Sequence, residues 1–559
     1  MPHAVSMAST GLQALILCGP GSSFPTFTSN PDEHPKALLP IANRPMVWYP
    51  IDFCYRMGVT DITLVCPPSA SQAINTAVNT NPYLTALPLP RPDVLAPADL
   101  DYNTGTAEIL RLPEVRNLVK SDFIVLPCDL VCEVGGEKLL QAWMVKSASL
   151  TDLLSSLKLS NGKNIPSSGG LGVWYDTKAI VPIKKEETDF IATAPIAPTP
   201  TPTPKDSLIP KLRNLVYSIP TDSLKDLTEE RKGVPIRHGL MKAHPRVRML
   251  TTHRDAHIYI FPKWILDFVK ENERFDSIGE DVVGWWAKAG WQKGLAEKLR
   301  VLDVCEQKHT KDDNTSLASP TSGHSHQEPS VPGGSSVYQN SLLTAAYLGQ
   351  DLRRESDSPK SAHAKQVPPI LAYVHSGEAQ APGSLIRRVD TAQLLLALSL
   401  QLAKIPSLEE SGPEASSPYA HSKKIAYPEG VKSRTTITKQ DCLIDNNVTI
   451  EEKTSIKECV IGANCQINEG AKLSQCLLMD GVVVGKGCKL TKCILGKRCV
   501  IGAGSVLTDV EVQENLLVEP RTEDKDNKLM SSEGLEATEA EMEEVLQEQE
   551  LSTEDAVED

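Results

Sequence analysis

The chain of 559 residues lacks any uninterrupted apolar run near the roughly 20 residues that a membrane-spanning helix requires. Positive charge is also scarce, because 57 lysines and arginines face 71 aspartates and glutamates, which gives a formal net charge of −14. Residues 521–559 hold 15 acidic and three basic residues, so the remainder of the chain is nearly neutral. Proteins that bind nucleic acid through its phosphates need a cationic surface. The composition therefore disfavours both a membrane protein and a direct nucleic-acid binder.

No two of the 13 cysteines have the Cys-x-x-Cys spacing that zinc sites and redox dithiols commonly use. No basic segment precedes the first apolar run, and that run is short and ends in glycine and proline, so a secretory signal is not expected. Disulfides persist mainly in oxidising compartments. We therefore expect reduced thiols and a cytoplasmic, cytosolic location.

The most regular feature is a 17-residue repeat in the last third of the chain. Large aliphatic residues recur with spacings of 6, 6 and 5, four times over, from Ile444 to Leu507. The residue two positions before each of them is small, and in seven cases it is cysteine. A coil with three flat sides buries one large and one small side chain on each side, and such coils stack into one continuous core. Residues 436–520 are therefore predicted to form a left-handed parallel β-helix of hexapeptide repeats, in which the cysteines act as compact apolar groups.

The first part of the chain alternates short apolar runs with helical patterns. Strands are expected at residues 12–18, 61–66, 123–126 and 369–375. Helices are expected at residues 46–57, ended by Gly58, and at residues 390–403. This alternation predicts an α/β domain with a mostly parallel sheet over residues 10–405.

Four segments lack such periodicity. A proline-threonine stretch at about 195–204 and a segment rich in serine, histidine and proline at about 306–365 are expected to be disordered insertions. Residues 406–435 are expected to link the two domains. Residues 521–559 are expected to form an acidic, disordered tail, although the spaced apolar residues within it keep a docking role open.

Glycines at a strand's carboxyl end allow backbone amides to approach a phosphate, and a nearby lysine adds positive charge. Here Gly19 and Gly21 follow the first expected strand, and Lys36 comes after them in the stretch His34-Pro35-Lys36. A short glycine-containing loop is weak evidence by itself. Its order relative to the downstream motifs Asn103-Thr104-Gly105-Thr106-Ala107 and Pro127-Cys128-Asp129 is more informative.

Together these motifs resemble the nucleotidyltransferase domain of sugar-nucleotide pyrophosphorylases, which has a Rossmann-like α/β fold. In that family the four elements bind triphosphate, contact phosphate, contact the base and hold magnesium. The resemblance assigns these roles, in that order, to Gly19 and Gly21, to Lys36, to Gly105 and Thr106, and to Asp129. A second metal carboxylate of the family is matched by Asp390.

Two departures argue against catalysis. The family's loop carries an arginine that stabilises the transferred phosphoryl group, but here the loop continues as Ser22-Ser23-Phe24. The family's sugar-binding segments are not preserved around residues 252–259. We therefore expect a vestigial nucleotide site with no catalytic residue, no resident cofactor and no metal. In that case Asp129 and Asp390 have ordinary capping or hydrogen-bonding roles.

Hexapeptide β-helices also occur in acyltransferases, which use a histidine as general base. The chain has no histidine after His421. Acetyl transfer by this region is therefore not expected, and a packing and assembly role is favoured.

A nucleotidyltransferase-like domain joined to a hexapeptide β-helix resembles the gamma and epsilon subunits of translation initiation factor 2B. The stretch from Lys36 to Pro50 and the segment Arg388-Val389-Asp390-Thr391 resemble the gamma-subunit family in particular. Only 39 residues follow Pro520 and none is aromatic, so the helical catalytic domain of the epsilon subunit is not expected here.

This resemblance implies a non-catalytic subunit of a complex that exchanges GDP for GTP on the GTPase initiation factor 2. The implied partners are the epsilon subunit, the other subunits of the complex and the GTPase, and the complex would be inhibited by phosphorylated initiation factor 2. An enzymatic alternative is a mannose-1-phosphate guanylyltransferase, or its regulatory subunit, with Asp129 and Asp390 holding Mg²⁺.

Overall fold

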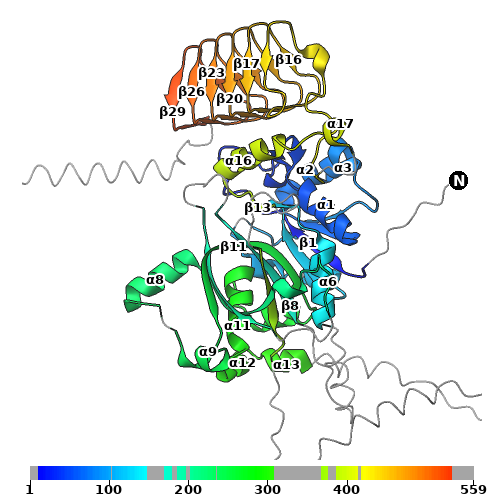
Figure 1. Ribbon diagram of the computed structural model, residues 1–559, viewed down its shortest axis with the longest axis vertical. Coiled ribbons are helices and arrows are strands. Elements are labelled where there is room, and N and C mark those ends of the chain that lie inside the picture. Colours follow the sequence, from blue (N-terminus) through cyan, green and yellow to red (C-terminus); the bar gives the residue numbers. More distant parts are fainter. Residues whose placement is uncertain are drawn as a thin grey trace, which may run out of the picture.

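The computed structural model describes residues 10–101, 103–147, 169–178, 186–196, 202–234, 236–306, 367–375, 385–412 and 417–531. It consists of an α/β domain and a carboxyl-terminal β-helix stacked on one end of it (Figure 1). The centre of the predicted proline-threonine insertion, nearly all of the predicted insertion at 306–365 and the tail beyond residue 531 lie outside the described residues. Their predicted disorder therefore stays a prediction.

A nine-stranded mixed sheet forms the centre of the α/β domain, with the strand order β5-β4-β1-β6-β11-β8-β12-β10-β9. The first four of these strands are parallel to one another, and β8 is parallel to β12. The remaining pairings are antiparallel. The prediction of a mostly parallel sheet is therefore correct only for the half of the sheet that contains β5, β4, β1 and β6. The strands are β1 (Gln13–Leu17), β4 (Asp61–Val65), β5 (Asp93–Leu95), β6 (Phe123–Pro127), β8 (Gly170–Asp176), β9 (Asp189–Pro195), β10 (Leu212–Pro220), β11 (Arg248–Phe261) and β12 (Ile370–His375).

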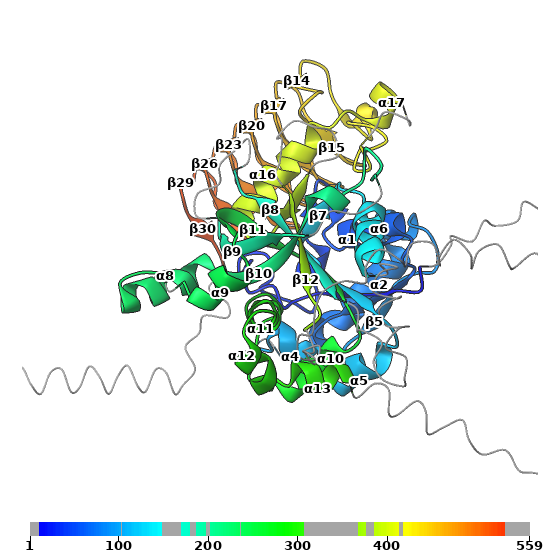
Figure 2. The ribbon, with the colours of Figure 1, turned by 60° about the horizontal axis from the view of Figure 1, so that its bottom comes forward.

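Helices cover both faces of this sheet (Figure 2). Along β1, Ala14 and Ile16 join one buried cluster and Leu15 joins another, because successive side chains of a strand point to opposite faces. The first cluster contains residues of α1 (Trp48–Met57), α2 (Pro68–Thr80), α6 (Gly136–Ser147) and α16 (Ala392–Ala403). The second contains residues of α4 (Thr106–Ile109), α5 (Pro113–Leu118), α10 (Ile265–Glu271), α11 (Gly284–Ala289), α12 (Lys293–Lys298) and α13 (Val301–Glu306). Helix α1 ends at Gly58, as predicted, where φ is +81°.

Several short elements complete the domain. Two small antiparallel pairs are β2 (Pro40–Ile41) with β3 (Arg44–Pro45), and β7 (Leu130–Cys132) with β13 (Ile386–Arg388). The remaining helices are α3 (Pro82–Thr85), α8 (Thr221–Arg231), α9 (His238–Ala243) and α17 (Leu408–Ser411). Short 3-10 turns form η1 (Lys36–Leu38), η2 (Ile209–Lys211) and η4 (Pro428–Gly430), and a π-helical segment forms η3 (Ile278–Val283). None of the helices in the described part of the chain has both the length and the apolar character needed to cross a membrane.

The carboxyl-terminal region forms three parallel ladders, which are the three sides of the predicted β-helix. The first contains β14 (Thr436–Ile437), β17 (Ser455–Lys457), β20 (Lys472–Ser474), β23 (Lys489–Thr491), β26 (Val506–Thr508) and β29 (Glu523–Lys525). The second contains β15 (Leu443–Ile444), β18 (Val460–Ile461), β21 (Leu477–Leu478), β24 (Ile494–Leu495), β27 (Glu511–Val512) and β30 (Lys528–Leu529). The third contains β16 (Thr449–Ile450), β19 (Gln466–Ile467), β22 (Val483–Val484), β25 (Val500–Ile501) and β28 (Leu517–Val518).

The predicted packing inside these coils is confirmed. In register, Ile461 pairs with Leu478 and Leu478 pairs with Leu495, so the large aliphatic residues stack above one another. All twelve predicted small positions are buried. All 13 cysteines are free thiols, and those at small inward positions are Cys442, Cys459, Cys465, Cys476, Cys488, Cys493 and Cys499.

The β-helix is longer than the predicted range of 436–520. Ile425 and Val431, in the expected linker, form isolated parallel bridges with Ile444 and Ile450. At the other end, β29 and β30 continue to Leu529 inside the segment expected to be the acidic tail. The repeat is broken in this last coil because the inward position of β29, which is in register with Leu507, is occupied by Asp524 and not by an aliphatic residue.

One side of the β-helix is buried against the α/β domain. Leu443, Val460, Leu477 and Ile494 point outward from the second ladder, yet they belong to the same buried cluster as the leucines of α16. Figure 1 shows α16 directly beneath the β-helix. These four residues also recur every 17 positions, a second apolar stripe that was not used in the sequence prediction. Polar contacts across the same boundary include Tyr83 Oη donating to Asp445 Oδ2 at 3.0 Å.

Candidate functional site

A cavity of about 190 Å³ lies at the carboxyl ends of β1 and β6. Four of the predicted nucleotide-site residues line it, namely Gly19, Lys36, Thr106 and Asp129. These residues come from two loops, η1 and the first turn of α4, so the fold gathers them as the motif order implied. This is also the edge of an open α/β sheet at which ligands generally bind.

The other two predicted glycines do not line the cavity. Gly21 has a φ of +88°, and a Cβ there would lie 2.9 Å from Thr28 Cγ2, so close packing explains this glycine. Gly105 packs against Asp276, since a Cβ on it would lie 2.4 Å from the Asp276 carbonyl oxygen. Both glycines therefore allow close packing of segments next to the cavity without lining it.

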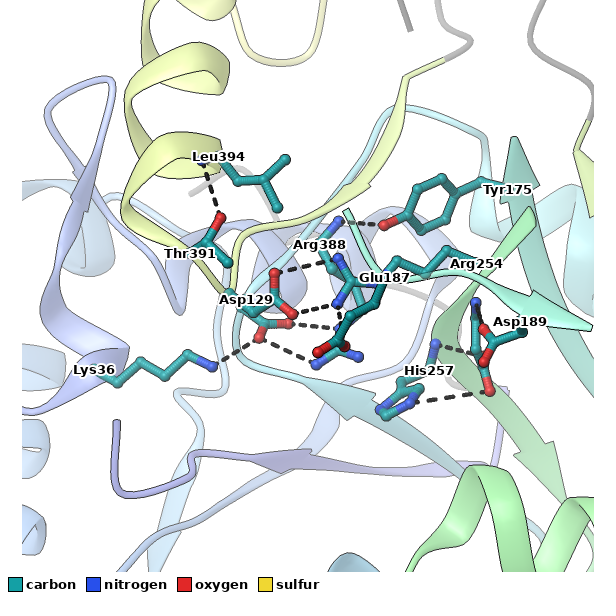
Figure 3. A network of polar contacts seen from close by, with 12 residues as sticks. Lys36, Asp129, Tyr175, Glu187, Asp189, Arg254, His257, Arg388, Thr391 and Leu394 are labelled. Atoms are coloured by element: carbon teal, nitrogen blue, oxygen red, sulfur yellow. Dashed lines mark hydrogen bonds and ion pairs between the residues drawn. The ribbon is translucent and has the colours of Figure 1, made fainter. Parts of the chain in front are cut away.

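Asp129 is the centre of a buried ionic network (Figure 3). Its carboxylate is 1% exposed, and Oδ2 accepts from Lys36 Nζ at 2.8 Å. Arg388 Nε donates to Oδ1 at 3.1 Å and Arg388 Nη2 donates to Oδ2 at 3.3 Å. Burial favours protonation, but the charges of Arg388 and Lys36 outweigh it and hold the pKa of Asp129 far below its ordinary value. Both oxygens of the predicted metal carboxylate thus already have cationic partners.

Asp390, the second predicted metal carboxylate, is engaged in the same way. Arg254 Nη1 donates to Asp390 Oδ1 at 3.2 Å, and Arg254 Nη2 donates to Oδ2. Glu187 adds a weaker contact, at 3.4 Å from Arg254 Nη2. Asp390 is not among the residues that line the cavity. Within the described residues, no group of three or more histidines, cysteines, aspartates or glutamates is arranged to hold a metal ion.

The partners of these two carboxylates were not predicted from the sequence. Arg388 lies two positions before Asp390, inside the very motif that was matched, and Arg254 lies in the segment judged to have lost its sugar-binding residues. An arginine adjacent to an expected metal ligand was the available signal. It pointed to a carboxylate whose charge is balanced by protein rather than by a metal.

A second polar cluster borders the cavity on strand β11. The pairing of β11 with β8 shifts between Asp255 and Tyr259, and His257 in this bulge has a φ of +51°. His257 N donates to Asp255 Oδ1 at 2.8 Å, Tyr259 Oη donates to Asp255 Oδ2, and Asp255 N donates to Asp189 Oδ2 at 2.6 Å. The bulge places His257 and Tyr259 in the wall of the cavity.

The surroundings of Asp255 and Asp189 raise the pKa of both carboxyl groups. Burial, reinforced by the neighbouring Asp189, raises the pKa of Asp255 to about 7. Burial likewise raises the pKa of Asp189 to about 6. A carboxyl pair that gains charge near neutral pH therefore lies behind the wall of the cavity, where Asp255 contacts His257 and Tyr259. The degraded motif at residues 252–259 did not predict this pair.

A larger cavity of about 650 Å³ lies between the two domains. The α/β domain contributes η1 and the amino-terminal loops, including Phe27, Glu33 and His34, while the β-helix contributes Asp480 and Glu514. Glu514 Oε1 accepts from Ser29 Oγ at 2.7 Å. This cavity results from the docking of the β-helix, and its lining includes residues of the two stretches singled out in the sequence, His34-Pro35-Lys36 and Lys36 to Pro50.

Comparison with known proteins supports the predicted family. Residues 425–523 match a family model described as the EIF2B subunit epsilon LbH domain, which agrees with the predicted left-handed β-helix. Among curated proteins, the Translation initiation factor eIF2B subunit gamma of Schizosaccharomyces pombe is 28% identical over 289 residues, which are 52% of this chain and 54% of that protein. The chain is similar to the eIF2B gamma subunits. The protein of the same name from Caenorhabditis elegans is 20% identical over 279 residues, or 49% of this chain and 57% of that protein. The chain thus spans about half the length of the curated relatives that it matches.

Proposed function

We propose that the chain is a non-catalytic subunit of the initiation factor 2B complex, which exchanges GDP for GTP on initiation factor 2. The similarity to eIF2B gamma subunits, together with the β-helix matched at residues 425–523, carries this proposal. In this role the chain pairs with the catalytic epsilon subunit in the cytosol and helps to hold the GTPase. Inhibition of the complex by phosphorylated initiation factor 2 follows from the same relationship.

Exchange of a nucleotide makes and breaks no covalent bond within the nucleotide. An exchange factor works because it binds the nucleotide-free GTPase more tightly than the nucleotide-bound form. A subunit can therefore contribute binding surface without any reactive group. The β-helix docks on the α/β domain through the apolar boundary at α16, so the chain offers surface from both domains for that task.

The electrostatics of the pocket support a non-catalytic role. A magnesium ion at the predicted site would have to compete with Lys36 and Arg388 for Asp129, and with Arg254 for Asp390. Magnesium gives up its water ligands reluctantly and needs regular octahedral geometry. Two carboxylates that are already neutralised by buried cations are poor ligands for it. We propose that these ion pairs have replaced the metal site, and that the cavity retains at most nucleotide binding through Gly19, Lys36 and Thr106.

Affinity purification of the full chain from its own cells, followed by mass spectrometry of stoichiometric partners, tests the subunit role. Recovery of the epsilon subunit, the other exchange-factor subunits and initiation factor 2 is expected. Recovery of the chain alone, or with a pyrophosphorylase-like partner only, would contradict the proposal.

The guanylyltransferase alternative is favoured by one observation, the cavity that still gathers Gly19, Lys36, Thr106 and Asp129. Incubation of the purified chain with Mg²⁺, GTP and mannose 1-phosphate separates the two functions. We expect no pyrophosphate release above that of a chain carrying Asp129→Asn. Robust release that is lost in Asp129→Asn would instead establish a transferase.

A further inference from the structure

The connection between α8 and β11 concentrates positive charge on a chain that is acidic overall. Residues 231–248 contain six arginines and lysines and no acidic residue, while the whole chain has a net charge of −14. Helix α9 lies within this connection and packs on the α/β domain through Leu240, while α8 projects from the body of the domain (Figure 1). We call the surface formed by these six cations the basic arm, which consists of Arg231, Lys232, Arg237, Lys242, Arg246 and Arg248.

Four acidic residues of α8, namely Asp222, Asp226, Glu229 and Glu230, precede the basic arm, but the six cations of the arm are not paired with them. All six residues are exposed, and none forms an ion pair with a carboxylate of the described residues. Arg237 donates to a neutral group, Gln292 Oε1, at 3.2 Å. By contrast, the arginines of the buried network each have a carboxylate partner. The basic arm is therefore a surface whose counter-charge is supplied from elsewhere.

Apolar side chains are interspersed with these cations. Val234 is 44% exposed, Ile236 is 51% exposed and Met241 is 44% exposed. Large apolar groups beside unpaired charges are typical of a surface that meets a partner with both acidic and apolar side chains.

We infer that the occupant of the basic arm is the chain's own acidic segment at residues 532–559. That segment contains 12 acidic residues and no basic residue, so its charge is opposite to that of the arm. Its apolar residues are spaced among the acidic ones, which matches the mixed character of the arm. They are Leu535, Met542, Val545, Leu546, Val557 and Leu551.

The geometry of the chain permits this contact. The described structure ends at Ser531, just after β30, and the β29–β30 end of the β-helix lies on the same side of the molecule as α8 and α9 in both ribbon views (Figures 1 and 2). A segment of 28 residues extends up to about 90 Å. A compact protein of this length has a diameter of roughly 60 Å. The segment is therefore long enough to reach the arm from the end of the β-helix.

Tethering favours this occupant over a free one. A segment tethered to its target has an effective concentration of about 1 mM there. To displace it, a separate acidic ligand must be present above that concentration or bind the arm more tightly. The attraction depends on salt, because the Debye length falls from about 10 Å at 0.1 M to about 3 Å at 1 M ionic strength. The tail thereby screens the arm from other polyanions.

Carbodiimide cross-linking of the purified full chain tests this contact, because the reagent joins lysine amines only to carboxylates that touch them. At about 0.1 M salt we expect cross-links from Lys232 or Lys242 to glutamates of residues 532–559, and at about 1 M salt we expect their loss. An equal mixture of isotopically heavy and light chains shows whether each cross-link lies within one molecule.

Charge-reversal variants sharpen the test. Arg237→Glu with Arg246→Glu keeps both reactive lysines and should abolish the cross-links, and adding Glu543→Lys with Glu544→Lys should restore them. The matched control is Lys472→Glu with Lys489→Glu, two exposed lysines on the β-helix, which should leave the cross-links unchanged. Absence of cross-links at low salt, cross-links mainly between heavy and light copies, or equal loss in the control would each overturn the inference.

Discussion

In the β-helix the residues that stack on one another are 17 positions apart, whereas the ion pairs of Asp129 and Asp390 in the α/β domain join residues separated by 93 to 259 positions. The two regions also differ in what they bury. The β-helix buries aliphatic residues and thiols, while the α/β centre buries Asp129, Arg254 and Asp255. Local repetition stabilises the first region through many equivalent contacts. The second depends on a few charge pairs for which no substitute exists nearby.

This contrast predicts different responses to single substitutions. A buried ion pair is costly to break because the remaining charge stays buried without its partner. An apolar coil loses only the contacts of the deleted group and gains a cavity. The four predictions that follow compare the two regions, beginning with the largest expected effect.

Arg388→Ala should lower the free energy of unfolding by about 4 kcal/mol, because Asp129 then keeps only Lys36 as a partner in a buried site. Urea unfolding of the purified chain measures this. Arg387→Ala is the matched control, since Arg387 donates to the Asp176 carbonyl oxygen at 2.8 Å but forms no ion pair with a carboxylate of the described residues. Adding Asp129→Asn to Arg388→Ala should recover part of the loss. Equal effects of Arg387→Ala and Arg388→Ala would show that the ion pair is not what stabilises this region.

Leu478→Ala should lower the free energy of unfolding by about 3 kcal/mol, because Leu478 is fully buried between Ile461 and Leu495 in the middle of the β-helix. Leu529→Ala removes the same atoms from the last coil, where Leu529 is only half-buried, and should cost much less. Hydrogen exchange of peptides from the β-helix, combined with urea unfolding, distinguishes the two variants. If both substitutions cost the same, the coils would not act as the stacked equivalent units that the repeat implies.

The same contrast explains what could be predicted from the sequence. Ile444 and Ile461 were assigned to the core because a short period places them one above the other, and Leu443 and Val460 could have been assigned to the domain boundary from the same period. The pairing of Arg254 with Asp390 has no such signal, because 136 residues separate them. The motif order located Gly19, Lys36, Thr106 and Asp129 at one cavity. It could not show which cations neutralise the carboxylates, since that depends on how β11, β13 and β7 come together.

The carboxyl pair on β11 should make stability depend on pH. The folded pKa of Asp255, about 7, is above its ordinary value of 3.8, so the folded state keeps a proton that the unfolded state has released. Stability contributed by this group is present at low pH and is lost as the pH rises toward 7. We expect the free energy of unfolding, measured with urea, to fall by about 2 kcal/mol between roughly pH 5 and pH 7. Asp255→Asn should flatten this slope, and an unchanged slope would assign it to other groups.

A substitution at the boundary between the two domains should change the free energy of unfolding least. It also tests whether the two regions unfold together. Tyr83→Phe removes the hydrogen bond from Tyr83 Oη to Asp445, which is 3.0 Å long and bridges the α/β domain and the β-helix. Its loss should cost about 1 kcal/mol. Tyr49→Phe removes a comparable bond within the α/β domain alone, from Tyr49 Oη to the Ile41 carbonyl oxygen at 2.8 Å.

Hydrogen exchange measured separately in the two regions compares these variants. Because apolar side chains from both domains share one cluster at α16, we expect Tyr83→Phe to speed exchange in both regions by a similar factor. Tyr49→Phe should do the same if unfolding is cooperative across the boundary. If Tyr49→Phe instead affects only the α/β domain, the β-helix is an independently folded unit. In that case the buried stripe of Leu443, Val460, Leu477 and Ile494 orients the two domains without coupling their stability.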